Sequence, residues 1–193
     1  MKLVFVRAVC ILSLVLCCMQ ARSEFERFGD AFRFLPLYVM VVSLGLEDYE
    51  GVGQLTLGAL STQLATEGMK KGFEAMHDNG YAVKFAKRPC CDNWQGMPSG
   101  HASGAFSAAG FVYYRYGWKA ALPVGALAAL TAASRVEAKK HSILQVSVGA
   151  LLAWGFAWVF TSEYVPKNTL ITPNIETDMH GNPQVSLNIL YRF

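Results

Sequence analysis

The sequence predicts an all-α protein, a membrane-embedded bundle of about five to six helices with a small β-hairpin appended at the C-terminus. Hydrophobic residues make up 53% of the 193 residues, and they gather in separate runs of helical length. Only the last segment of the chain alternates apolar and polar side chains, which is typical of a strand. The length allows one domain with a substantial core.

The first 23 residues predict a secretory signal peptide, with an uncleaved first span as the alternative. Lys2 supplies the positive start, an apolar run reaches Met19, and Ala21-Arg22-Ser23 has the small-x-small pattern of a cleavage site. Cleavage after Ser23 would leave equal numbers of basic and acidic residues in the mature chain. A neutral chain gives no electrostatic reason to bind nucleic acid, so this partner is excluded.

The residues after the signal predict six helical segments. The first, Glu24 to Arg33, alternates charged residues with phenylalanines, which is typical of a helix on a membrane surface or at the end of a bundle. A short apolar run follows at residues 34–46. The remaining segments are Val52–Met76, Ala102–Tyr114, Ala120–Ala133 and Ile143–Phe160. Only the last approaches the length that crosses a bilayer unaided, so the others are expected to be short spans or buried bundle helices.

Small residues dominate two of these segments, from Gly104 to Gly110 and from Gly125 to Ala129. Small side chains let helices approach closely, which favours the interior of a membrane bundle. They suit a soluble core equally well, so both settings stay open at this point.

The tail, residues 166–193, predicts a β-hairpin. Val185 to Phe193 alternates in the manner of a strand, His180-Gly181-Asn182 supplies a turn, and Leu170–Met179 is the expected partner strand. A terminal aromatic residue resembles the last strand of outer-membrane barrels, but one hairpin cannot close a barrel. The hairpin is therefore expected to pack on the helical domain of residues 24–165, with an outer-membrane contact as the alternative.

Removal of the signal would leave two cysteines, Cys90 and Cys91. Adjacent cysteines close only a strained ring, so no stabilising disulfide is predicted. No metal-binding partners stand at suitable spacing, so no metal site is predicted.

The residues that carry chemistry lie between Arg88 and His141. Arg88-Pro89 is followed by Pro-Ser-Gly-His at 98–101, and then by Ser134-Arg135 with His141 six residues after the arginine. Two guanidinium groups can clamp phosphate oxygens, and backbone N–H groups near a glycine can add further donors. Of the two histidines, one can attack phosphorus while the other protonates the leaving oxygen. The pattern therefore indicates a site for a phosphoryl group.

The order and spacing of these motifs resemble the type 2 phosphatidic acid phosphatase superfamily. This superfamily includes lipid phosphate phosphatases, bacterial acid phosphatases and vanadium haloperoxidases, and the resemblance covers residues 30 to 160. Within it, the chain looks most like the small bacterial lipid A phosphatases. The resemblance implies a helical fold and a phosphatase activity that needs no metal or other cofactor.

The resemblance also implies roles for individual residues. His141 would be the nucleophile that forms a phosphohistidine, His101 the general acid, and Arg135 the third catalytic residue. The phosphate-binding residues would be Arg88, Ser99, Gly100 and a lysine. At Gly100 a side chain would also block the close approach of the backbone to an anion.

The lysine departs from the family pattern. The family places it seven residues before the arginine of Arg-Pro, where this chain has Tyr81. Lys70 is the favoured substitute, because Thr-Glu-x-x-Lys-Lys-Gly-Phe at residues 66–73 resembles the end of the corresponding family helix. Lys71 and Lys84 are the alternatives.

A second departure concerns the residue four positions after the nucleophile, which is usually an aspartate in the family and is Gln145 here. An amide can orient an imidazole through a hydrogen bond, but it cannot balance a positive charge. A backbone carbonyl or Glu137 could orient the ring instead. This departure leaves room for a catalytically weak or inactive relative that uses its tail for interactions at the cell envelope.

The leading hypothesis is a phosphatase of a membrane lipid, with lipid A, phosphatidylglycerol phosphate or undecaprenyl pyrophosphate as the substrate. It would sit in the inner membrane of a Gram-negative cell, with the active site facing the periplasm. The alternatives are a soluble periplasmic acid phosphatase that acts on small phosphate esters, and a protein associated with the outer membrane.

Overall fold

The computed structural model describes residues 24–165, 169–177 and 183–191. The predicted signal peptide and the predicted turn at His180 lie outside these residues. The chain divides into a helical unit that ends at Ser162 and a second unit that begins at Glu163. The two units are described separately.

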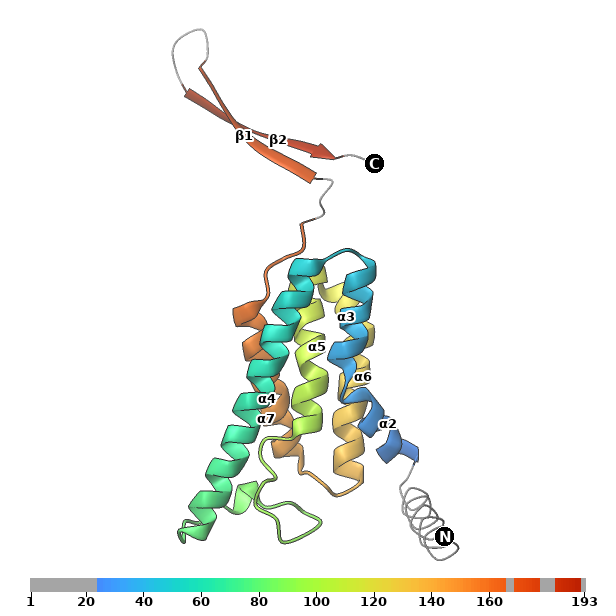
Figure 1. Cartoon of the computed structure of the whole chain (residues 1–193), viewed down its shortest axis with the longest axis vertical. Helices are drawn as coiled ribbons and strands as arrows, with labels where there is room; N and C mark the ends of the chain where they lie inside the picture. The colour runs from blue at the N-terminus through green and yellow to red at the C-terminus, as the bar shows by residue number, and fades with distance from the viewer. Residues whose placement is uncertain (1–23, 166–168, 178–182, 192–193) are drawn as a thin grey trace, which may run out of the picture. The chain divides into compact units, whose positions relative to one another are not determined.

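In the described part of the helical unit, six α-helices confirm the predicted class. They are α2 (Glu24–Phe32), α3 (Leu35–Gly45), α4 (Tyr49–Asp78), α5 (Gly100–Tyr116), α6 (Trp118–Glu137) and α7 (Ile143–Phe160), with a single 3₁₀ turn at Lys84–Ala86. Helix α5 lies in the middle and packs against the other five (Figure 1). The long loop between α4 and α5, the start of α5 and the end of α6 meet at the lower end of the bundle in this view.

The sequence predicts the start of α7 correctly but places the end of α6 too early. Helix α7 begins at Ile143 as expected, because Ser142 and Gln145 form a reciprocal capping box. Helix α6 was expected to end at Ala133, but it continues to Glu137 and carries Arg135 in its last turn. Backbone bonding continues to the N–H of Ala138, and the chain leaves the helix at Lys139, which has a φ of 54°.

Small residues of α5 set how closely the helices approach one another. A Cβ on Gly110 would lie 2.8 Å from the Cβ of Ala157 on α7, and a Cβ on Gly104 would lie 2.8 Å from the backbone oxygen of Arg33. Ala105, Ala108 and Phe111 are fully buried beside them. The glycine- and alanine-rich segment is therefore the packing centre of the bundle, as close helix contact requires.

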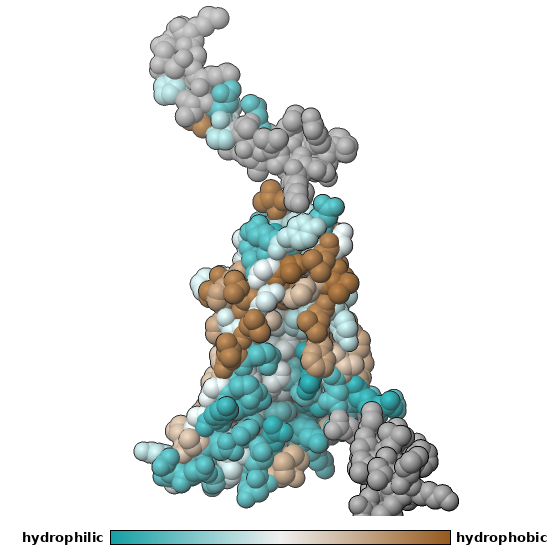
Figure 2. Space-filling view, in the orientation of Figure 1, coloured by the Kyte–Doolittle hydropathy of each residue, from teal (hydrophilic) through white to brown (hydrophobic). Residues whose placement is uncertain are grey.

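Large apolar side chains are exposed along the helices. In Figure 2 they gather on one stretch of the bundle, while the end that carries the α4–α5 loop is hydrophilic. They include Leu37, Val41, Val42, Leu57, Leu64, Leu151 and Trp158. Helix α7 is long and apolar enough to cross a membrane, and only 28% of it is buried; α2 and α3, bent by 49°, would together make a second such segment. Monomeric soluble domains seldom expose this much apolar surface.

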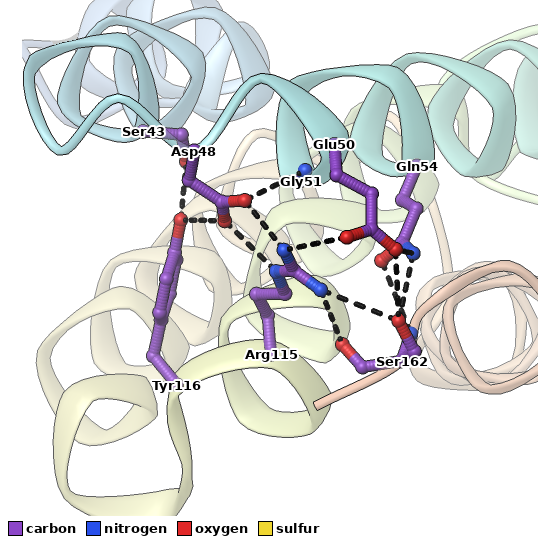
Figure 3. A network of polar contacts seen from close by, with 8 residues as sticks. All are labelled: Ser43, Asp48, Glu50, Gly51, Gln54, Arg115, Tyr116 and Ser162. Carbon is purple, nitrogen blue, oxygen red and sulfur yellow. Dashed lines mark hydrogen bonds and ion pairs between the residues drawn. The ribbon is translucent and has the colours of Figure 1, made fainter. Parts of the chain in front are cut away.

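A buried ion pair, drawn in Figure 3, ties helix ends together. It lies at the turn between α3 and α4, which is at the upper end of the bundle in Figure 1. Asp48 caps the start of α4 by accepting from the N–H of Gly51, and it receives bonds from Nε and Nη2 of Arg115 and from the hydroxyl of Tyr116. Arg115 also donates to the backbone oxygen of Ser162, 3.1 Å away. Burial acts to raise the pKa of Asp48, but these hydrogen bonds outweigh it and lower the pKa to about 2. The carboxylate is therefore charged. It links the start of α4 to the end of α5, and Arg115 extends this link to Ser162, just after α7.

The second unit is the predicted hairpin. Strand β1 (Thr169–Thr177) pairs antiparallel with β2 (Pro183–Tyr191), and the register runs from Thr169 opposite Tyr191 to Thr177 opposite Pro183. The hairpin itself is confirmed. Its packing on the helices stays a prediction.

Candidate active site

Most of the predicted site residues line one pocket of about 740 Å³. They reach it from α4, from the loop before α5, from the start of α5, from the end of α6 and from the connection between α6 and α7. The histidines and cations that line it are Arg33, Lys70, Arg88, His101, Arg135, Lys140 and His141. Residues from distant parts of the sequence, from Arg33 to His141, therefore share one cavity, and its concentration of positive charge suits an anion.

The ring of His141 is held in one orientation. Its Nδ1 lies 2.8 Å from the backbone oxygen of Gly96 and 3.2 Å from Oε1 of Gln145. Because a carbonyl oxygen can only accept, Nδ1 must carry the hydrogen. The other ring nitrogen, Nε2, then holds a free lone pair on a ring that lines the pocket. This is the form that a nitrogen nucleophile requires.

Gln145 is itself fixed by the backbone. Its Nε2 donates to the backbone oxygens of Phe85 and Lys87, 2.9 and 2.8 Å away, so its Oε1 is left to face His141 and the N–H of Ser142. The amide therefore orients the imidazole and anchors the loop that leads to Arg88. A carboxylate at this position would face two carbonyl oxygens, which explains physically why an amide suits this site.

We expect Gln145→Glu to lower both stability and turnover. The carboxylate would leave the oxygens of Phe85 and Lys87 without a donor, which should cost about 2–3 kcal/mol of unfolding free energy. Looser support of the ring should reduce kcat by about 10- to 100-fold. Thermal unfolding and kcat measured on purified protein test both effects, with Gln184→Glu on exposed β2 as the charge-matched control. An unchanged kcat would show that Gln145 does not position the ring.

The surroundings keep His141 neutral. Burial of the ring and, after it, the positive charge of Arg88 lower the pKa of His141 to about 4, although the bonds to Gly96 and Gln145 act to raise it. The ring is thus uncharged near neutral pH. An uncharged imidazole is the reactive form for attack on phosphorus.

His101 faces a carboxylate to which no sequence motif points. Its Nε2 lies 2.9 Å from Oδ1 of Asp30 on α2, and the same oxygen accepts from Nη1 of Arg135 at 3.0 Å. Burial lowers the pKa of His101 to about 4, Asp30 opposes this shift, and the charge of Arg135 adds to it. No spacing links residue 30 to the Pro-Ser-Gly-His motif, and α2 was expected only to lie on a membrane or to cap the bundle.

Gly100 and Lys70 lie side by side at the start of α5. A Cβ on Gly100 would come within 3.1 Å of Nζ of Lys70, so glycine leaves room for the ammonium group. Lys70 is buried and pairs with Glu67 at 2.6 Å. Of the three candidate lysines, Lys70 lines the pocket, whereas Lys71 and Lys84 are exposed and do not line it.

Ser99 is placed differently. It is fully buried, its Oγ accepts from the N–H of Ala102 as the N-cap of α5, and its own N–H donates to the backbone oxygen of Gln145. It is not among the pocket-lining residues. The predicted contact between Ser99 and phosphate stays a prediction, and the role visible in the structure is to begin α5.

Arg88 has an unused donor. Its Nε is buried and has no hydrogen-bond partner within the described part of the chain. A buried donor without an acceptor is costly, and its cost disappears when an acceptor arrives. Arg88 lines the pocket, and a phosphate oxygen is the acceptor that a guanidinium group matches best.

Three comparisons with known proteins show the family and the fold of this chain. Residues 52–169 match the PAP2 superfamily. A curated lipid A 4'-phosphatase from Helicobacter pylori is 55% identical over 168 residues, covering 87% of this chain and 85% of the relative. The crystal structure of Aquifex aeolicus LpxE matches the fold with a TM-score of 0.56 and 21% identity, over 77% of this chain and 92% of that one.

Proposed function

The chain belongs to the PAP2 superfamily and is a phosphatase, and on this premise we propose that it hydrolyses a phosphate ester of lipid A through a phosphohistidine. One observation carries the proposal: a buried, neutral His141 with a free Nε2 shares a cationic pocket with His101. The relative that is 55% identical is named a lipid A 4'-phosphatase, which supports the choice of lipid.

The proposed reaction has two steps. Nε2 of His141 forms a bond to phosphorus as the ester P–O bond breaks, and a proton from His101 goes to the departing oxygen. A water molecule then attacks the phosphohistidine, gives its proton to His101, and releases inorganic phosphate with neutral His141. Arg88, Arg135 and Lys70 would neutralise the charge that builds up on the phosphoryl oxygens, so the proposal needs no metal.

The walls of the pocket support a lipid substrate. Beyond the cations, the pocket is lined by Phe34, Pro36 and Leu37 near the start of α3 and by Ala59 and Leu60 of α4. The exposed apolar side chains of the bundle are the surface that a bilayer would cover. This surface supports our further proposal that the protein lies in a bacterial inner membrane, with the hydrophilic end and its pocket facing the periplasm.

The proposal predicts phosphate release from purified lipid A in detergent, with EDTA present throughout. The panel includes phosphatidylglycerol phosphate, undecaprenyl pyrophosphate and a chromogenic phosphate ester. We expect kcat/KM to be highest for lipid A, because its acyl chains can use the apolar walls of the pocket. Loss of activity in EDTA would contradict the metal-free mechanism. A preference for the chromogenic ester, together with extraction of the protein without detergent, would favour a soluble acid phosphatase.

A further inference from the structure

We propose that Asp30 is a positioning residue of the phosphatase reaction, which holds His101 as the proton donor and fixes Arg135 beside it. The inference rests on the proposed function, and it names a residue that lies outside the part of the chain matched to the superfamily, residues 52–169.

The contacts of Asp30 determine where the hydrogen of His101 lies. Oδ1 of Asp30 can only accept, and it is 2.9 Å from Nε2 of His101. Nη1 of Arg135 is farther from the same nitrogen, at 3.4 Å, and can only donate. Nε2 cannot satisfy both neighbours, so the shorter contact assigns its hydrogen to the bond with Asp30. Nδ1 is then the ring nitrogen that must gain a proton and deliver it.

Asp30 is held in place by the packing of α2 on α6. A Cβ on Gly29 would lie 1.9 Å from Oγ of Ser134, so glycine is required where the two helices meet. Nη2 of Arg135 donates to the backbone oxygen of Glu26 at 2.8 Å, and its Nη1 donates to Asp30. The arginine is thereby clamped at two points of α2. A carboxylate on a rigid helix can orient a ring precisely.

The charge of Asp30 has a chemical consequence for the acid. An imidazole donates a proton well only if its charged form is accessible, and a nearby carboxylate stabilises that form. A doubly charged phosphate in the pocket acts in the same direction. The other charged groups lining the pocket with His101 are Glu26, Arg33, Glu67, Lys70, Arg88, Arg135 and Lys140, together with neutral His141. Most of these are cations, so the carboxylate that touches His101 is the group that favours its protonation most directly.

The test compares Asp30→Asn with Asp30→Ala in the full-length protein in detergent. Asparagine keeps an oxygen that accepts from His101 and Arg135 but removes the charge, whereas alanine removes both. Glu24→Gln is the matched control, because Glu24 is an exposed acid on the same helix. Lipid A and p-nitrophenyl phosphate are the two substrates. The aryl ester has a good leaving group and needs little help from an acid.

For Asp30→Asn we expect kcat on lipid A to fall about 10- to 100-fold, while kcat on the aryl ester falls by less than about threefold. The alkaline limb of the kcat–pH profile should move to lower pH by about one unit, since the charged form of His101 loses its partner. Asp30→Ala should also reduce turnover of the aryl ester, because Arg135 is released. Glu24→Gln should behave as wild type.

Equal losses on both substrates with an unmoved pH profile would overturn the inference and leave Asp30 a purely structural role. Unchanged kinetics of Asp30→Asn on both substrates would overturn it as well. Failure of the proposed function looks different, because the wild-type protein would then leave lipid A intact. Thermal unfolding of each variant separates a loss of acid assistance from a loss of fold.

Discussion

His141→Ala should abolish phosphate release from lipid A, with turnover reduced at least about 10³-fold. The side chain supplies the only attacking atom in the proposed reaction. The same variant should accumulate no phosphoenzyme. Rapid quench with radiolabelled phosphate ester, followed by a test for an acid-labile phosphohistidine, measures this directly.

The matched control is His77→Gln. His77 stacks on Trp94 at a centroid distance of 3.7 Å and does not line the pocket, so its replacement should leave turnover close to wild type. If His141→Ala kept full activity, the phosphohistidine mechanism would be wrong, whatever the substrate. A phosphoenzyme that formed equally in wild type and variant would lead to the same conclusion.

Asp48→Asn should have the largest effect on stability, with a loss of about 3 kcal/mol or more. The side chains of Asp48 and Arg115 are only 2% and 3% exposed. Asparagine keeps the cap of α4 and the shape of the site, but it removes the buried counter-charge of the guanidinium group and leaves it the exposed Glu50. Thermal unfolding in detergent at neutral pH measures the loss, while turnover of the folded fraction should be unchanged at the distant pocket.

Glu50→Gln is the control for this prediction, because Glu50 lies 3.6 Å from Arg115 but is 70% exposed. Its removal should cost less than about 1 kcal/mol. The double variant Asp48→Asn/Arg115→Met should recover part of the stability, since no unpaired charge remains. If Asp48→Asn unfolded at the same temperature as wild type, the prediction that the Asp48–Arg115 ion pair stabilises the fold would be wrong.

The lowered pKa of Asp48 determines how the stability of the fold changes with pH. A carboxyl whose folded pKa is about 2, below the ordinary value of 3.8, stabilises the fold above pH 3.8 and loses this contribution as the pH falls toward 2. The gap in unfolding temperature between wild type and Asp48→Asn should therefore narrow across this window. A gap in unfolding temperature that stayed constant down to pH 2 would show that the charge of Asp48 does not stabilise the fold.

The sequence by itself determined the helical segments and the phosphate-binding motifs. Apolar runs and caps act over a few residues, so the start of α7 at Ile143 could be predicted from the chain alone, with the cap at Ser142 as its cause. The hairpin could be predicted because apolar and polar side chains alternate along neighbouring residues of the tail. The end of α6 was expected at Ala133, where the apolar run stops, whereas backbone bonds carry the helix on to Glu137.

Only the tertiary structure decided which groups control the two histidines. The bond from His141 to Gly96 spans 45 residues, and the bond from His101 to Asp30 spans 71. Neither partner stands at a spacing that marks it, because such contacts depend on how whole helices pack. The packing of α2 against α6 and the closure of the loop before α5 create them. Local chemistry therefore fixed the segments and their reactive residues, and long-range packing fixed their orientation and charge.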